Sequence, residues 1–365
     1  MQHEITTVRP LLDSRGVLLE PGYSKGLLPQ YSRSAIKGGA LRIKEWDYYL
    51  ITCDDFAVAL TIADNSYMGL DSISLLDFRI PWEHTTSPMS FLTLGKRNFP
   101  SSSASGSVKS GGRHHKISFE HHGDYRLLTF HMDKFFNGKP IDGEIRLENP
   151  PQESMVIVTP FAEKETAFYL NQKINCLPAS GELHFDGKTY AFEPGASFAV
   201  LDWGRGVWTY ENTWYWGSAS GLVDGVPFGW NIGYGFGDTS AATENMLFYN
   251  GKAHKLNHVF FHIPIKNKKY ITHGGCCGGI SGKVVSTADY TEDYLSPWTF
   301  SSDDGRFEMD FVPIIDRAAC TDIKLISSDQ HQVFGRFTGR AVLDDGTVIK
   351  VKDFLGFAEK VHNKW

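Results

Sequence analysis

The 365-residue sequence has little that would serve a disulfide framework, a membrane span or a nucleic-acid interface. Its five cysteines are odd in number, two are adjacent, and none has CxxC spacing, which is typical of reduced thiols in a cytosol. It has no run of about 18 apolar residues, and MQHEITTVRP at its start lacks the apolar run of a signal peptide. A net charge of −6 supplies no basic face to neutralise phosphates. We therefore expect a cytoplasmic protein with no membrane span and no nucleic-acid partner.

Motifs for metal and nucleotide chemistry are also missing. The sequence has no Walker loop and no G-x-S-x-G elbow. Adjacent cysteines in THGGCCGG, Cys276 and Cys277, have no partners at ligand spacing, and the paired histidines near residues 114–122 lack the spacing of a metal site. We expect neither a metal nor any other cofactor.

Turn signals dominate what the sequence does contain. Asn-Gly and Asp-Gly dipeptides tolerate the positive φ angles of tight hairpins. They begin at Asn137, Asp142, Asp186, Asp224, Asn250, Asp304 and Asp345. Several separate strand-like segments, as in GELHFDGKTYAF, which predicts β-hairpins. Aromatic residues at 13% and 36 glycines also favour strands, so we predict an all-β, mostly antiparallel fold with few short helices.

The length of the chain favours two domains. We place the boundary near residues 175–195, which gives an N-terminal β-barrel or sandwich domain over 1–190 and a C-terminal one over 191–365. The segment 100–116, PSSSASGSVKSGGRHHK, is rich in Ser and Gly. Because strand-like KISFEHHGDYRLLTFHM follows at once, we interpret it as a mobile loop inside the first domain.

Carboxyl groups within and near an aromatic stretch are the candidates for chemistry. LDWGRGVWTYENTWYWGSASG places four tryptophans within fourteen positions, with Asp202 among them. Loss of hydration there would raise the pKa of Asp202 and fit it to donate a proton. Pairing with Arg205, the more frequent outcome for a buried charge, would instead lower that pKa and make the pair structural. Glu244 is a second candidate acid, and Glu359 is expected to cap or pair near a barrel end.

A second stretch, GVPFGWNIGYGFGD, alternates aromatic residues with glycines. Asn231 is the only side chain on its glycine face. That face either leaves a trough in which Asn231 meets a ligand or lets another backbone approach closely, and close packing is the more frequent case. In WYWGSAS the rings of Trp214 and Trp216 share a face, which suits a flat apolar ligand or an ordinary core.

Several longer motifs resemble one family over almost the whole chain. They are EWDYYLI, NCLPASG, LDWGRGVW with WYWGSASG, FGWNIGYGFGD with ENMLFYNGKAHKL, and DDGRFEM, and the family is domain of unknown function 2804. The resemblance implies, more remotely, a lipocalin-like calycin fold with two β-barrel domains. Relatives of that kind include carotenoid 1,2-hydratases, tocopherol cyclases and fungal Diels–Alderases, whose substrates are apolar. Asp202 and Trp203 are similar in placement to a junction motif of those relatives.

Three functions stay open at this point. The first is a cofactor-independent lyase or isomerase that hydrates, cyclises or isomerises an isoprenoid- or lipid-like molecule, with Asp202 or Glu244 as the acid. The second is a carrier that binds the same molecule without turnover. The third is a structural or partner-binding protein whose aromatic residues are all core. For the first two, the expected ligand-binding residues are Trp203, Arg205, Trp208, Trp214, Trp216, Asn231 and Tyr234.

Overall fold

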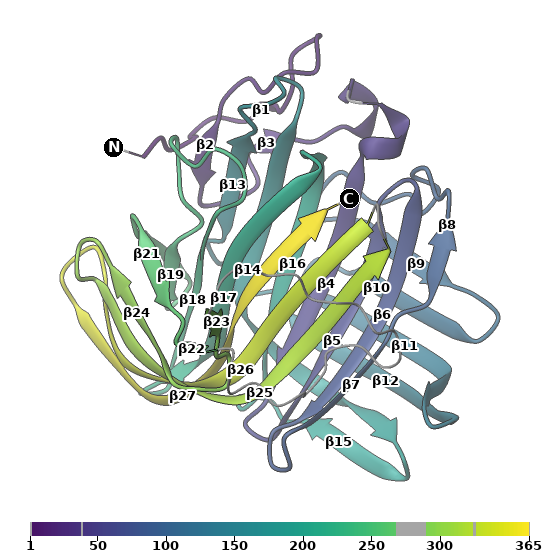
Figure 1. Cartoon of the computed structure of the whole chain (residues 1–365), viewed down its shortest axis with the longest axis vertical. Coiled ribbons are helices and arrows are strands. Elements are labelled where there is room, and N and C mark those ends of the chain that lie inside the picture. The colour runs from purple at the N-terminus through teal and green to yellow at the C-terminus, as the bar shows by residue number, and fades with distance from the viewer. Residues whose placement is uncertain (1, 38, 268–289, 324–325, 365) are drawn as a thin grey trace.

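The computed structural model describes residues 2–37, 39–267, 290–323 and 326–364, and it is built almost entirely from antiparallel strands (Figure 1). Helical structure in these ranges consists of two single 3-10 turns, η1 (Arg33–Ala35) and η2 (Ala40–Arg42). The predicted all-β class with few short helices is confirmed.

The first large sheet contains fourteen strands, in the order β7-β6-β5-β4-β16-β14-β12-β11-β10-β9, with β2, β8, β13 and β15 beside that path. Their bounds are β2 Gly22–Ser24, β4 Lys44–Thr52, β5 Phe56–Asp64, β6 Met68–Asp77, β7 Trp82–Thr86, β8 Met89–Phe91, β9 Ser107–Gly111, β10 His115–His121, β11 Tyr125–Phe136, β12 Lys139–Glu148, β13 Met155–Pro160, β14 Phe168–Phe185, β15 Lys188–Phe192 and β16 Phe198–Val207. Two short segments, β1 (Arg9–Pro10) and β3 (Pro29–Gln30), form a separate parallel pair. Within β14 the register with β16 shifts between Ile174 and Leu177, which bends the strand.

The second large sheet contains nine strands in the order β20-β19-β18-β17-β27-β26-β25-β24-β21. Their bounds are β17 Glu211–Val223, β18 Val226–Tyr234, β19 Met246–Tyr249, β20 Lys252–Lys255, β21 Val259–His262, β24 Trp298–Ser302, β25 Phe307–Ile323, β26 Ile326–Val342 and β27 Val348–Lys364. A separate pair is made by β22 (Ile265–Asn267) and β23 (Tyr290–Glu292). The long strands β25, β26 and β27 curl, and in Figure 1 β25 and β26 pass in front of the first sheet.

The predicted hairpin turns are confirmed at six of the seven dipeptides. All six join strands that pair with each other, namely β11–β12, β14–β15, β17–β18, β19–β20, β24–β25 and β26–β27. Asp142-Gly143 is the exception, because it lies inside β12. A Cβ on Gly143 would stand 2.6 Å from the ring of Phe130, so packing rather than a turn requires glycine at this position.

Two segments differ from their sequence-based outline. Residues 107–111 form strand β9, paired with β10, so within segment 100–116 the residues outside strands are 100–106 and the connection 112–114. The small and hydroxylated residues of β9 occupy an edge strand, where little apolar burial is needed.

Strand β16 belongs to the first sheet and β17 to the second, and we propose residues 208–210 as the domain boundary.

Each sheet encloses a core of its own, and strand alternation decides which side chains enter it. Leu201 and Trp203 on β16 lie in the first core, so Asp202 between them points to the opposite face. In the second core, Trp230 contacts the rings of Phe307 and Phe337 with centroids 5.4 and 5.2 Å apart. These aromatic side chains fill the described interior of the second sheet.

The outer faces of the two sheets pack against each other. Two further apolar clusters combine residues of both sheets, one around Phe236 and one around Phe334. Close approach is possible because the outer face of β18 carries glycine: a Cβ on Gly229 would lie 2.4 Å from the Ala219 carbonyl oxygen and 2.8 Å from Cys176 Sγ. At Gly229 the packing interpretation of the glycine face is the correct one.

Gly229→Ala should therefore destabilise the protein by overpacking this interface, with a loss of about 1–3 kcal/mol in the free energy of unfolding. Gly26→Ala is the matched control, because a Cβ there has no heavy atom within 4 Å. Urea unfolding of both variants measures the difference. Equal midpoints for the two variants would contradict the close packing described here.

Candidate functional site

A row of polar side chains crosses the outer face of the first sheet. Lys173 on β14 is the register partner of Asp202 on β16, and Asp202 is in turn the partner of Tyr48 on β4. Lys173 Nζ lies 2.9 Å from Asp202 Oδ1, and Asn171 Nδ2 donates a 2.6 Å hydrogen bond to the same oxygen. Lys173 is 2% exposed and Asp202 8%, so the ion pair is almost entirely removed from water.

A second row crosses the facing side of the second sheet. Trp216 on β17, Glu359 on β27 and Gln332 on β26 are successive register partners. Gln332 Nε2 donates to Glu359 Oε2 at 3.0 Å, and Trp214 Nε1 donates to Glu359 Oε1 at 3.1 Å. Both oxygens of this buried carboxyl are thereby held by donors from the same sheet.

The two rows meet at Lys173 and Trp216. Lys173 Nζ lies over the Trp216 ring, 3.7 Å from its centroid, which is a cation–π contact between the sheets. The Trp216 indole N–H donates to Asn231 Oδ1 at 2.6 Å, and Asn231 Nδ2 donates to the Glu244 carbonyl oxygen at 2.7 Å. We call Lys173, Asp202, Glu244 and Glu359, with Trp216, the interface cluster.

Two carboxyl groups of the interface cluster have a pKa near neutrality. Burial raises the pKa of Glu244 to about 7; Lys173 opposes this shift, and Asp202 adds to it. Burial also raises the pKa of Glu359 to about 7, against the hydrogen bond from Trp214. Groups that titrate near pH 7 can both donate and accept protons under physiological conditions.

Lys255 lies near Glu244 at the edge of the interface cluster. Its Nζ donates to Thr243 Oγ1 at 2.9 Å and to the carbonyl oxygens of Asn245 and Leu256 at 2.8 and 2.7 Å. Burial lowers the pKa of this amine to about 7, although the charge of Glu244 raises it. A buried amine and a buried carboxyl with similar pKa values thus interact electrostatically.

Buried oxygens around the interface cluster lack hydrogen-bond partners. Asn171 Oδ1 and Gln332 Oε1 are both inaccessible and accept no hydrogen bond, which is costly in an apolar environment. A hollow between the sheets, with Val200, Ser218 and Phe357 in its wall, has a volume of about 10 Å³. The interface as described is therefore closely packed, and Asn171 Oδ1 and Gln332 Oε1 remain able to accept hydrogen bonds.

The structure brings six of the nine residues singled out in the sequence into this interface. Asp202 and Glu244 belong to the interface cluster, and Trp214, Trp216 and Asn231 contact it. Trp208 lies further along the same interface, where its ring meets Trp46 and Phe236 at 5.4 and 5.3 Å.

Three of the nine lie elsewhere. Trp203 is in the first core, where it contacts Tyr31. Tyr234 stacks on Tyr215 at 4.5 Å beside the second core. Arg205 is fully buried on the core side of β16.

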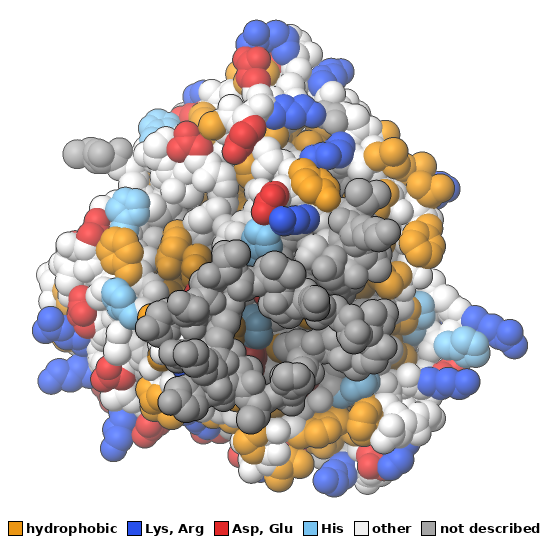
Figure 2. All heavy atoms as spheres, viewed as in Figure 1, with side chains coloured by type: hydrophobic (Ala, Val, Ile, Leu, Met, Phe, Trp, Pro, Cys, Tyr) orange, Lys and Arg blue, Asp and Glu red, His pale blue; other side chains and the backbone are white. Residues whose placement is uncertain are grey.

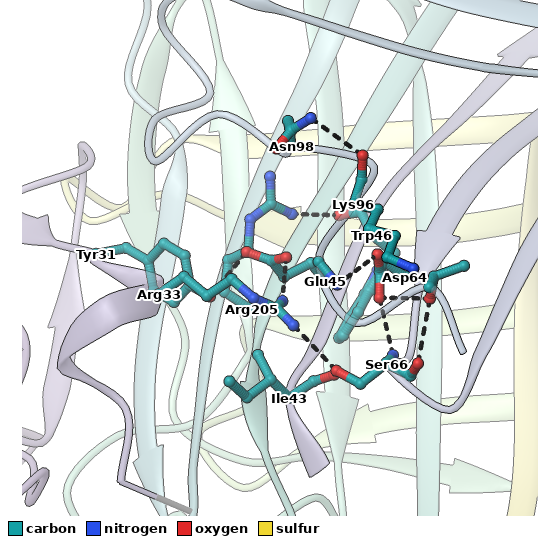
Figure 3. A network of polar contacts seen from close by, with 12 residues as sticks. Tyr31, Arg33, Ile43, Glu45, Trp46, Asp64, Ser66, Lys96, Asn98 and Arg205 are labelled. Carbon is teal, nitrogen blue, oxygen red and sulfur yellow. Dashed lines mark hydrogen bonds and ion pairs between the residues drawn. The ribbon is translucent and has the colours of Figure 1, made fainter. Parts of the chain in front are cut away.

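The anticipated Asp202–Arg205 ion pair is wrong. The two positions are three apart in the sequence, so a strand places them on opposite faces. Arg205 Nη2 instead lies 3.0 Å from Asp47 Oδ1, and its Nη1 donates to the Trp46 carbonyl oxygen at 2.7 Å. Figure 3 shows Arg205 close to Glu45, in a polar network of the first sheet that also includes Arg33 and Ser66.

Lys173 is not among the site residues predicted from the sequence. Glu359 is predicted there only to cap or pair near a barrel end. LNQKIN, at residues 170–175, alternates Asn171 and Lys173 with Leu170 and Ile174 in the middle of a strand, which was a usable signal for a buried polar face. No local pattern indicates which strand faces Glu359, because its partners come from 27 and 145 residues away.

Neither a charged surface patch on the face in Figure 2 nor a metal-ligand cluster within the described residues offers an alternative site to the interface cluster. On the face in Figure 2, acidic and basic side chains are interspersed and neither sign gathers. Within the described ranges, no three His, Cys, Asp or Glu side chains are grouped so as to hold a metal, while Cys276 and Cys277 lie outside those ranges. No helix in the described part of the chain is long and apolar enough to cross a membrane.

Solved structures with a similar fold exist at low sequence identity. An AttH-like protein from Nitrosomonas europaea is 11% identical, with a TM-score of 0.50 over 92% of this chain and 96% of that one. Kievitone hydratase from Nectria haematococca is 12% identical, with a TM-score of 0.46 over 88% of both chains. CghA with Sch210972 is 11% identical, with a TM-score of 0.48 over 97% of both. Likeness at this level concerns the fold alone.

No curated protein matches the chain in sequence. Residues 2–365 match the family described as domain of unknown function (DUF2804), which confirms the resemblance found in the motifs. The chain belongs to the DUF2804 family.

Proposed function

We propose that this protein is a cytoplasmic, cofactor-independent enzyme of the lyase or isomerase type. It binds a small apolar molecule, isoprenoid- or lipid-like, between its two sheets and exchanges a proton with it. The observation that carries this proposal is the placement of two near-neutral carboxyls, Glu244 and Glu359, beside a buried ion pair among aromatic rings. Protonation of an alkene needs an acid of this kind in a dry, aromatic environment.

Glu244 is the proposed acid. Among the described residues its carboxyl takes part in no ion pair, whereas Asp202 is paired with Lys173. When the Glu244 proton moves to an alkene carbon, the glutamate becomes a carboxylate and the neighbouring carbon becomes cationic. The negative charge of Asp202 then stabilises the cationic carbon electrostatically. Water that adds to the cation and returns a proton to the Glu244 carboxylate completes a hydration. Transfer of a proton from an adjacent carbon to that carboxylate completes an isomerisation.

Trp214 and Trp216 have different roles in this proposal. One face of Trp216 is occupied by Lys173, so Trp216 positions the lysine rather than stacking on a ligand from that side. Trp214 is half-buried and holds Glu359 through its indole N–H. A ligand that contacts Trp214 therefore contacts the group that orients the second carboxyl.

Ligand binding requires the interface to open. Pockets for small molecules enclose about 300–1,000 Å³, against the hollow of about 10 Å³ lined by described residues between the sheets. This tight packing favours a second candidate function, in which the interface cluster only joins the two sheets and fixes their orientation. A carrier without turnover is the third outcome that the experiments below separate.

Extraction of the purified protein with organic solvent, followed by mass spectrometry, should recover an apolar molecule. Incubation of the protein with that molecule in D₂O should then place deuterium on its carbon skeleton. Glu244→Gln should slow this exchange about 10²–10⁴-fold, the usual contribution of a general acid. Glu193→Gln, at an exposed position, is the matched control and should exchange normally.

Each failure in this experiment has a distinct meaning. Recovery of a molecule that takes up no deuterium in either protein supports a carrier. Deuterium uptake that is unchanged in Glu244→Gln refutes the proposed acid. If no molecule is recovered, the cluster is a structural joint.

The stability of the protein should depend on pH through Glu244. A carboxyl whose folded pKa exceeds its unfolded value, about 4.3, binds more protons in the folded state, so stability falls as pH rises from about 4.3 to about 7. Glu244→Gln removes this contribution. The variant should gain stability relative to wild type as pH rises through that window and keep the gain above pH 7, as measured by urea unfolding. Parallel curves would exclude a raised pKa at Glu244.

Trp214→Phe should shift the titration of Glu359 upward. The variant keeps an aromatic ring but loses the indole N–H that donates to Oε1, and that hydrogen bond lowers the pKa of Glu359. Carboxyl ¹³C NMR titration, assigned with Glu359→Gln, should report a pKa above 7. A downward or absent shift would show that the hydrogen bond does not stabilise the carboxylate.

A further inference from the structure

A small polar hollow lies in the first sheet, on the core side rather than at the interface. Its walls come from β4, β9, β10 and β11 and from the serine-rich segment 100–106, and its volume is about 20 Å³. Arg126, Asp47, His121 and Glu120 are among its lining residues. A space of this size holds one water molecule or an ion of similar size.

Arg126 brings a buried positive charge to this hollow. The residue is 4% exposed. Its Nη1 donates to the Ser103 carbonyl oxygen at 2.8 Å and to the Tyr49 hydroxyl at 3.3 Å, both of which are neutral acceptors. Its Nε is inaccessible to water and has no hydrogen-bond partner. Within the described residues Arg126 takes part in no ion pair.

The carboxyl groups in the wall are already paired. Asp47 Oδ1 lies 3.0 Å from Nη2 of the fully buried Arg205. Glu120 Oε1 lies 2.6 Å from Lys109 Nζ. Arg126 therefore interacts with Asp47 only through charge, without an ion-pair contact, and a buried charge that is incompletely compensated is unfavourable.

His121 adds a second unused donor beside Arg126. The two residues are register partners on β10 and β11, so their side chains share a face. The Gly123 backbone N–H donates to His121 Nδ1 at 3.1 Å, which leaves the proton of a neutral ring on Nε2. That atom is buried and has no hydrogen-bond partner. Burial, and then the charge of Arg126, lower the pKa of His121, which favours the neutral ring.

We propose that the hollow is a binding site for one small monovalent anion of the size of chloride. The anion accepts hydrogen bonds from Arg126 Nε and His121 Nε2 and balances the arginine charge. The volume of about 20 Å³ suits chloride better than the larger sulfate and phosphate ions. This site is separate from the interface cluster, and its existence does not depend on the proposed function.

The direct test is a crystal of the full-length protein grown in sodium bromide, with bromide as an anomalously scattering replacement for chloride. An anomalous peak within about 3.5 Å of both Arg126 Nε and His121 Nε2 is the expected result. A water molecule in that position, with no anomalous signal at saturating bromide, would overturn the proposal.

A solution experiment tests the same site without crystals. At constant ionic strength, replacing sodium gluconate with sodium chloride should raise the melting temperature by about 2 °C, because the anion binds only the folded state. His121→Phe, which keeps a ring but loses the donor, should lose most of this increase. The exposed Arg113→Gln should keep it. Equal melting temperatures in the two salts for the wild type would contradict the site.

Arg126→Gln removes the charge itself and should abolish the chloride effect. If that variant does not fold, the bromide crystal and His121→Phe still decide the question. A chloride effect that is unchanged in His121→Phe and in Arg126→Gln would place the anion elsewhere and refute the assignment.

Discussion

The ion pair between Lys173 and Asp202 is the contact on which the interface between the sheets depends. The two residues are direct register partners, so their geometry follows from the pairing of β14 with β16 and needs no flexible reach. Lys173 also lies over the Trp216 ring of the opposite sheet. The buried charge of Lys173 therefore helps to fix how the sheets face each other. Removal of Lys173 or of Asp202 would leave the other charge unpaired in an apolar environment. The raised pKa values of Glu244 and Glu359 result from the same burial.

Strand β16 separates two polar environments. Asp202 faces the second sheet, while Arg205 faces the first core and pairs with Asp47. The interface side carries Asp202, Glu244 and Glu359 beside Lys173. On the core side Asp47 pairs with Arg205, and Arg126 forms no ion pair within the described residues. Burial raises the pKa of Glu244 and Glu359 to about 7 on the first face, and on the second face Arg126 is the group for which we propose an anion.

Sequence patterns were reliable where local physics decides the outcome. The Asn-Gly and Asp-Gly turns place residues such as Asn137 and Asp186 at positive φ, which no distant contact needs to support. The family motifs likewise indicated the DUF2804 family, which the match over residues 2–365 confirms. Pairing between distant strands could not be derived in this way: Glu359 meets Trp214 across 145 residues, and Arg126 meets Ser103 through a loop. The predicted ion pair between Asp202 and Arg205 is excluded by strand alternation alone, because the two side chains point to opposite faces of β16.

Neutron diffraction from a deuterated crystal near pH 6 tests the central claim most directly, because it locates individual protons in the interface cluster. The account predicts a deuteron on the carboxyl of Glu244 and on that of Glu359, three on Lys173 Nζ, and none on Asp202. Bare carboxylates at both glutamates, or a neutral Lys173 beside a protonated Asp202, would contradict it.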